Sequence, residues 1–189
     1  MANAFDKVNH FFLFEIMPIF VFSKRFVRWV KACISNSWIA PLVNGRPTKF
    51  FQATKGLRQG FPMSPFLYLL VVESTSRKLQ QLQESGDLKG LNIARGVNVV
   101  NRAQFVDDTI MLGGVSSISA EIFKCALSTF LKASDNKVNS TKSKVYIWNC
   151  SPGTLAKIAR TLGFEGKLTW NSFNYLGIPI FKGKKMVVN

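Results

Sequence analysis

Hydrophobic and polar positions follow a helical period in three stretches of the chain. In residues 23–35, apolar side chains recur at helical spacing and basic ones fill the gaps, which predicts an amphipathic helix. Its apolar face is expected to hold Phe26, Trp29, Val30, Cys33 and Ile34. Apolar residues also recur at helical spacing in residues 116–134, which predicts a second helix. Residues 64–85 predict a helix with Ser64 as N-cap and Pro65 at its first position, and we expect its first half, apolar on nearly every side, to be buried.

The segments between these helices have the composition of strands and turns. Asn44-Gly45 lies between two apolar-rich segments and predicts a hairpin turn. Residues 97–112 predict two short strands that meet at Asp107-Asp108. Three more elements are predicted near the end of the chain: strands over residues 143–149 and 174–180, and between them a short helix over residues 154–163 capped by Thr154.

Hairpins mixed with long helices favour an α+β fold with an antiparallel sheet over a doubly wound parallel one. The sequence contains neither GxGxxG nor GxxxxGK[ST], so the usual dinucleotide and P-loop readings have no support. The most apolar stretch, residues 11–22, is shorter than the about 20 residues of a membrane span. It also carries Glu15 and Pro18, so we expect it to lie in the core.

Composition and net charge indicate the size of the core and the kind of partner that the protein binds. The 189 residues are 47% apolar and include 17 Phe and 4 Trp, enough for the core of one domain or of a piece of a larger one. The net charge of +15 indicates a polyanionic partner and favours nucleic acid over an anionic membrane surface. Three widely spaced cysteines form no CxxC pair, so neither a disulfide framework nor a zinc site is indicated, and a reducing compartment is expected.

The pair Asp107-Asp108 is the first candidate for chemistry. Two adjacent carboxylates at a strand junction repel each other, and a divalent cation relieves that repulsion. Mg²⁺ bound by such carboxylates and by substrate phosphates is suited to phosphoryl transfer. The alternative is an exposed Asp-Asp turn, which is common, and the spacing alone leaves both readings open.

Two further segments have a functional and an ordinary reading. Arg58 and Gln59 lie between glycines just before a helix N-terminus, where backbone N–H groups bind phosphates, but the same sequence also suits a plain loop. Lys142 and Lys144 follow a helix, and such lysines most often form a solvated face.

Six segments in this order resemble the reverse transcriptase domain of LINE-type (non-LTR) retrotransposons, particularly those of plants. They are AFDKVNH (4–10), LVNGRPTKFF (42–51), KGLRQGFPMSP (55–65), QFVDDT (104–109), KVNSTKS (137–143) and NYLGIPI (174–180). The resemblance implies a polymerase palm-type antiparallel sheet packed on helices. It implies that residues 1–181 are a fragment of the domain, mainly palm, with incomplete fingers and thumb, and that residues 182–189 are a short basic tail.

The resemblance also implies roles for single residues in an RNA-directed DNA polymerase. Asp107 and Asp108 correspond to the palm hairpin that holds Mg²⁺ or Mn²⁺, and Lys142 to a lysine that protonates the pyrophosphate leaving group. The partners implied are an RNA template, a DNA primer and a dNTP, without a membrane. Residues on the nucleotide would be Phe5, as an aromatic gate under the sugar, and Arg58, Gln59 and Gly60. Residues on the primer would be Tyr175, Leu176 and Gly177.

Two departures from the family pattern lower the expected activity. The family has a catalytic aspartate five residues before the gate aromatic, and counting back five from Phe5 passes Met1. Asp6 corresponds to a separate acidic residue that is not a metal ligand. Phe61 stands where the family usually has Asp in a QGDP pattern, and we expect it to perturb the nucleotide pocket. We therefore expect the chain to be inactive or strongly impaired as a polymerase.

Other functions remain as alternatives. The foremost is a non-catalytic nucleic-acid-binding remnant, since the net charge alone provides phosphate affinity. A remnant that does not fold stably is another, and a membrane-surface protein is the weakest because only residues 23–35 have the required pattern. An intracellular location, nuclear or cytoplasmic, is expected.

Overall fold

The structure is a computed structural model in which contacts divide the chain into two compact units. It describes residues 5–92, 96–105 and 108–182. Unit 1 comprises Met1–Lys78 and Ser128–Lys137, and unit 2 comprises Leu79–Leu127 and Val138–Asn189. The helices α3 (Ser64–Glu84) and α4 (Ser117–Ser134) each contribute residues to both units.

Unit 1 begins with two helices that are capped by their own sequence. Helix α1 (His10–Ile19) starts after Asn9, whose side chain accepts a hydrogen bond from the N–H of Phe12 at 3.1 Å. Helix α2 (Lys24–Ser35) starts after Ser23, which caps the N–H of Phe26 in the same way. The helix expected over residues 23–35 is thereby confirmed.

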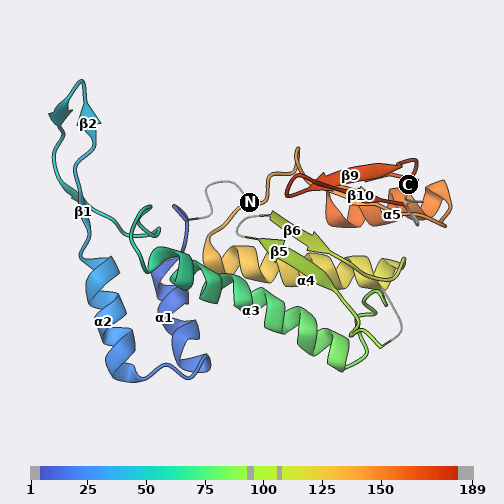
Figure 1. Cartoon of the computed structure of the whole chain (residues 1–189), viewed down its shortest axis with the longest axis horizontal. Helices are drawn as coiled ribbons and strands as arrows, with labels where there is room; N and C mark the ends of the chain where they lie inside the picture. Colours follow the sequence, from blue (N-terminus) through green and yellow to red (C-terminus); the bar gives the residue numbers. More distant parts are fainter. Residues whose placement is uncertain (1–4, 93–95, 106–107, 183–189) are drawn as a thin grey trace, which may run out of the picture. The chain divides into compact units, whose positions relative to one another are not determined.

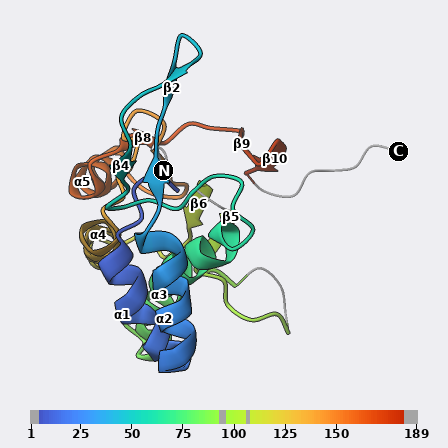
Figure 2. The ribbon, with the colours of Figure 1, turned by 90° about the vertical axis from the view of Figure 1, so that its left-hand side faces the viewer.

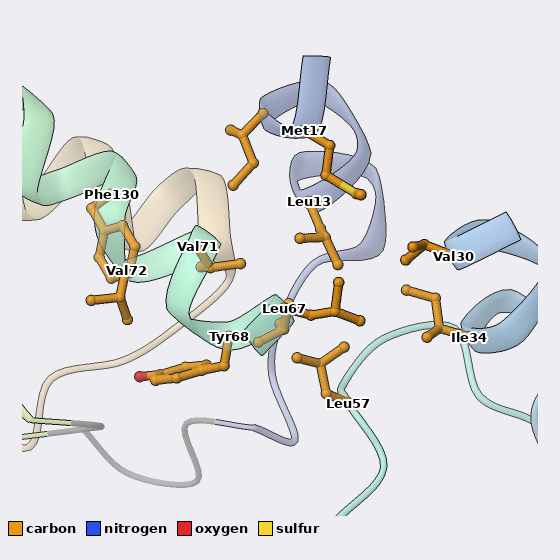
Figure 3. Close-up of a cluster of buried hydrophobic side chains, with 12 residues drawn as sticks. Leu13, Met17, Val30, Ile34, Leu57, Leu67, Tyr68, Val71, Val72 and Phe130 are labelled. Atoms are coloured by element: carbon orange, nitrogen blue, oxygen red, sulfur yellow. The ribbon is translucent and has the colours of Figure 1, made fainter. Parts of the chain in front are cut away.

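The core of unit 1 forms where α1, α2 and the first half of α3 meet (Figure 3). Leu13 and Met17 of α1 are fully buried, which confirms the core placement of residues 11–22 in part. Phe11, Ile19 and Val21 of the same segment are exposed. Leu13 and Met17 pack with the other buried residues of this cluster: Val8, Ile16, Val30, Ile34, Leu57, Leu67, Tyr68, Val71, Val72 and Phe130. Among the described residues, no helix is both long and apolar enough to span a membrane.

A two-stranded arm, residues 37–53, projects from the C-terminal end of α2 (Figures 1 and 2). Each side of the arm contains two short strands. The outgoing side has β1 (Trp38–Ile39) and β2 (Leu42–Val43), and the returning side has β3 (Arg46–Pro47) and β4 (Phe51–Gln52). Strand β1 is antiparallel to β4, and β2 is antiparallel to β3. The turn predicted at Asn44-Gly45 is confirmed, with φ of 51° and 76°. Positive φ at both central residues is the requirement of a tight hairpin turn.

Among its described residues, unit 2 combines three pairs of strands with helices. Strands β5 (Arg102–Phe105) and β6 (Asp108–Met111) are antiparallel, as expected for residues 97–112. The other strands are β7 (Lys144–Tyr146), β8 (Glu165–Lys167), β9 (Ser172–Tyr175) and β10 (Ile178–Phe181), and helix α5 (Pro152–Leu162) lies between β7 and β8 in the chain. One cluster of buried residues joins α3 to α4 through Leu79 and Phe123, and another joins α4 to α5 through Ala120 and Ile158.

Mixed helices and small antiparallel sheets confirm the α+β class, with two corrections to the strands. Strands β7 and β8 pair in parallel. Helix α5 packs against β8, and a Cβ at Gly166 would lie 2.9 Å from the Leu155 side chain, so a larger residue there would displace that side chain. The single strand predicted over residues 174–180 is wrong: β9 and β10 form an antiparallel hairpin there, because Gly177 and its neighbour take φ values that turn the chain back.

Three predictions about helix faces and caps are also wrong. Helix α3 is not buried all round in its first half, since Phe66 is 72% and Leu69 64% exposed. On α2, Trp29 and Cys33 are exposed and take no part in the buried face. Helix α5 is capped by Ser151, which accepts from the N–H of Thr154, because the chain begins the helix one turn earlier, at Pro152.

Candidate functional site

The loop that carries the predicted nucleotide residues is tied to the segment around Phe5 within unit 1. The N–H of Leu57 donates to the carbonyl of Phe5 at 2.7 Å, and the N–H of Gly56 donates to the carbonyl of Val8 at 2.8 Å. The His10 side chain hydrogen-bonds the Gly56 carbonyl at 2.6 Å. A Cβ on Gly56 would lie 2.7 Å from the carbonyl oxygen of Asp6, and its φ is +86°, so only glycine allows this approach.

Phe5 itself is fixed by ring packing. Its ring lies 4.8 Å from that of Tyr68, with 31° between the planes, and it packs against the core of unit 1. Tyr68 is only 2% exposed, so the partner ring is held in place. A half-buried aromatic ring with a buried partner suits the role of a rigid gate.

Gln59 and Asp6 are brought together, which the sequence did not indicate. The amide of Gln59 donates to the carboxylate of Asp6 at 3.2 Å, and both side chains are exposed. The expectation that Asp6 is not a metal ligand stays a prediction, and this hydrogen bond gives it another role, that of orienting Gln59. An exposed pair of this kind contributes little to stability but does limit the positions of the amide.

The predicted residues Arg58 and Gly60 lie in a tight turn just before α3. The carbonyl of Arg58 accepts from the Ser64 hydroxyl at 2.7 Å and from the N–H of Phe61 at 3.2 Å. The side chains of Arg58 and Gln59 remain exposed, as binding to a nucleotide would require. The ring of Phe61 packs against the core of unit 1. This packing fixes the turn to the core. It explains why an apolar residue suits this position, where the resemblance leads one to expect Asp.

In unit 2, a hydrogen bond connects a predicted primer residue with a predicted catalytic one. The phenol of Tyr175 donates to the backbone carbonyl of Asp108 at 3.4 Å. Burial raises the pKa of Tyr175, and the Asp108 carboxylate raises it further. The phenol therefore keeps its proton at neutral pH and acts as a donor. Asp107 lies outside the described residues.

The two remaining primer residues, Leu176 and Gly177, form the turn between β9 and β10. Their φ values are 52° and 78°, so both lie in the left-handed region. A non-glycine residue with such a φ is uncommon. Leu176 is 45% exposed. The segment predicted as a primer-gripping strand is therefore a hairpin tip that starts directly after Tyr175.

An aromatic cluster supports this hairpin, and the sequence reading missed it. The rings of Tyr146 and Phe173 stack at 4.5 Å, and Trp170 lies 5.7 Å from Phe173 and 5.9 Å from Trp148. The indole N–H of Trp170 donates to the carbonyl of Ile147 at 3.1 Å. The signal that could have revealed it is the alternation of Tyr146 and Trp148 within the strand predicted over residues 143–149, because period-two aromatics share one face of a strand.

Lys142, predicted to protonate the leaving group, lies in a turn after α4. Its N–H donates at 3.2 Å both to the carbonyl and to the side chain of Asn139. Its ammonium group is exposed. Within the described part of the chain, the structure records no bond from this ammonium to Asp108, so the role of Lys142 stays a prediction.

Of the two aspartates predicted to bind a divalent cation, the structure describes only Asp108. Among residues 5–92, 96–105 and 108–182, no group of three or more His, Cys, Asp or Glu side chains gathers. Asp108 offers an exposed carboxylate at the start of β6, paired in register with Phe105. An exposed carboxylate oxygen is the ligand that Mg²⁺ prefers, so the chemistry of Asp108 fits the ion.

Comparisons with known proteins give the class of this chain. The family described as "Reverse transcriptase (RNA-dependent DNA polymerase)" matches residues 1–180. The chain belongs to the reverse transcriptase family. This confirms the resemblance found in its six sequence segments.

Individual relatives agree with this class. An uncharacterized mitochondrial protein of Arabidopsis thaliana is 30% identical over 63% of this chain and 97% of its own length. An uncharacterized 149 kDa protein of transposon TX1 from Xenopus laevis is 24% identical over 93% of this chain, but over 13% of its own length. A retrovirus-related Pol polyprotein of the type-2 retrotransposable element R2DM of Drosophila melanogaster is 24% identical over 59% of this chain and 10% of its own. Of the two transposable-element proteins, the chain thus matches only a small part.

Proposed function

We propose that the chain forms the palm of an RNA-directed DNA polymerase that adds dNTPs to a DNA primer on an RNA template. The observation that carries the proposal is the hydrogen bond from Tyr175 to the carbonyl of Asp108. It joins the hairpin tip assigned to the primer with the strand assigned to the metal. A polymerase needs these two close together, because the primer end must reach the metal-bound nucleotide.

In the proposed reaction, the 3′-hydroxyl of the primer attacks the α-phosphorus of the dNTP, and pyrophosphate leaves. Asp107 and Asp108 would hold a divalent ion, Mg²⁺ or Mn²⁺. Such an ion supplies Lewis-acid stabilisation of the charge that develops on the phosphates. Lys142 would donate the proton that the leaving pyrophosphate takes up.

The residues of unit 1 would select and orient the nucleotide. Phe5, fixed against Tyr68, would stand under the sugar and clash with a 2′-hydroxyl. Gln59, hydrogen-bonded to Asp6, and Gly60 would line the nucleotide pocket, with Arg58 near the phosphates. Tyr175, as a neutral donor beside Asp108, would hold the strand of the hairpin that grips the primer.

We further propose that a polypeptide of just these 189 residues extends primers poorly. They contain no carboxylate five positions before Phe5, and a metal site with part of its ligands missing stabilises the reacting phosphates less. The test is primer extension on an RNA template with Mg²⁺ and dNTPs, for the chain and its Asp107→Asn variant. We expect little extension by either. Robust extension by the chain that Asp107→Asn abolishes would contradict the impairment and support the polymerase assignment.

A non-catalytic nucleic-acid-binding function is the second candidate, favoured by the net charge of +15. It predicts an RNA affinity that falls steeply with salt and does not change with EDTA or with Asp107→Asn. Binding that requires Mg²⁺ would argue against it. An intracellular site of action, nuclear or cytoplasmic, is part of either proposal and rests on the three widely spaced cysteines.

A further inference from the structure

The surface of α2 and the arm carries charge of a single sign. Residues 16–72 include eight basic side chains and no acidic one; the basic residues are Lys24, Arg25, Arg28, Lys31, Arg46, Lys49, Lys55 and Arg58. The four on α2 and the two on the arm are all exposed. A surface without compensating acids attracts polyanions and repels basic partners.

Exposed aromatic rings lie among these basic side chains. Trp29 on α2 is 56% exposed, and the guanidinium of Arg25 lies 4.8 Å from its ring centroid. On the arm, Trp38 is 62% and Phe51 is 51% exposed. Nucleic-acid bases stack on such rings, and cations next to the rings bind the phosphates.

The arm is attached to the helix that bears the basic residues. The side chain of Gln52 donates to the carbonyl of Ser35 at 2.7 Å, and the N–H of Ala53 donates to the carbonyl of Ser37 at 2.9 Å. Every residue from 41 to 52 is exposed. An isolated two-stranded ribbon is only marginally stable in water, so an occupant that covers its rings would also stabilise the arm.

We propose that α2 and the arm form a binding site for single-stranded RNA, separate from the residues assigned to nucleotide and primer. The basic side chains of α2 bind phosphates, and Trp29, Trp38 and Phe51 provide stacking for unpaired bases. The lack of acidic residues favours this occupant over a second protein, and the exposed rings favour a single strand over a duplex. The choice of RNA over DNA rests on the proposed function, in which RNA is the template.

The test measures binding of a fluorescent oligouridylate of about 20 nucleotides, long enough for more than one site. The variant Arg25→Gln/Arg28→Gln/Lys31→Gln removes three charges from α2 and keeps residues that favour helix. Its matched control is Lys124→Gln/Lys157→Gln/Arg160→Gln, which removes three exposed helical charges in unit 2. Anisotropy is read without dNTP and with EDTA, so the assay can fail while primer extension succeeds, and the reverse.

The α2 variant is expected to bind at least about 10-fold more weakly at moderate salt and to lower the slope of log affinity against log salt by about 2, since each phosphate contact contributes about 0.7. The control should change affinity less than about 2-fold. A second variant, Trp38→Leu/Phe51→Leu, is expected to weaken binding at least about 5-fold. Equal losses in the α2 variant and its control would overturn the proposal. So would tighter binding of duplex RNA, or of oligothymidylate, than of oligouridylate.

Discussion

The hairpin β9–β10 of unit 2 and the arm of unit 1 turn on the same kind of residue pair but have different support. Leu176-Gly177 and Asn44-Gly45 both take positive φ. In the first hairpin, the ring of Phe173 packs against that of Trp170, and the hydroxyl of Tyr175 donates a hydrogen bond to the carbonyl of Asp108. The arm is exposed at every residue from 41 to 52. Turn chemistry thus decides where the chain folds back, while tertiary packing decides whether the hairpin is held in one place.

The largest expected effect is a difference in stability between two tryptophan variants, one in each hairpin region. Trp170→Ala removes a half-buried ring from the aromatic cluster and should lower the free energy of unfolding by about 2 kcal/mol, less than for a fully buried ring. Trp38→Ala removes an exposed ring of the arm and should change it by less than about 0.5 kcal/mol. Urea unfolding followed by circular dichroism measures both. Equal losses would show that the arm is also part of the folded core.

A second pair of variants tests the shared turn chemistry. Neither Gly177 nor Gly45 has an atom within 4 Å of an added Cβ, so alanine at either position costs only backbone strain, about 1 kcal/mol. Gly177→Ala should lower the melting temperature, because its hairpin unfolds together with unit 2. Gly45→Ala should leave the melting temperature unchanged and weaken oligouridylate binding. The comparison fails if Gly45→Ala lowers the melting temperature as much as Gly177→Ala.

The hydrogen bond between Tyr175 and Asp108 predicts a smaller effect. Tyr175→Phe should lower the free energy of unfolding by about 0.5 kcal/mol, since the bond is long. The pKa of Tyr175 is higher in the folded chain than in the unfolded one. Its contribution to stability is therefore complete below the ordinary tyrosine value, about 10, and is lost as pH rises through the raised value. Stability measured against pH should fall less steeply at alkaline pH in Tyr175→Phe than in the parent chain.

The smallest effect concerns an ion pair between the base of the arm and the end of α4. The ammonium of Lys55 lies 2.8 Å from the carboxylate of Asp135, and both are half exposed. The hydrogen bond and the charge of Lys55 lower the pKa of Asp135. The pair contributes above the ordinary aspartate pKa and is lost as pH falls through the lowered value. Asp135→Asn should flatten the acid side of the stability profile slightly, and a steeper acid limb would contradict this.

Sequence periodicity predicted α2 to α5 because their caps and apolar faces are local, but it did not predict α1, whose segment is apolar without a clear period. Ser23 and the apolar period of α2, or Asn44-Gly45 in the arm, specify their elements without distant contacts. The cap of α5 was misplaced by one turn because Ser151 and Thr154 have similar side chains. The apolar residues of 174–180 predict one strand, and this pattern does not reveal the turn at Leu176-Gly177.

Long-range contacts around the candidate site could not be predicted in this way. The resemblance pointed to Phe5, Gln59 and Tyr175, but not to their partners. The hydrogen bond between Gln59 and Asp6 joins positions 53 residues apart, and that between Tyr175 and Asp108 joins positions 67 apart. The exposure of Trp29 was also missed, since a ring at helical spacing is ordinarily a core residue.

The central claim, that these residues form a reverse transcriptase palm, is tested most directly by placing a carboxylate five positions before Phe5. Adding Met-Asp before Met1 places an aspartate five positions before Phe5, and adding Met-Asn is the matched control. On an RNA template with Mg²⁺ and dNTPs, the Met-Asp form should extend a primer at least about 100-fold faster than the Met-Asn form, and Asp107→Asn should abolish the gain. Equal, slow extension by both forms, with oligouridylate binding intact, would contradict the claim.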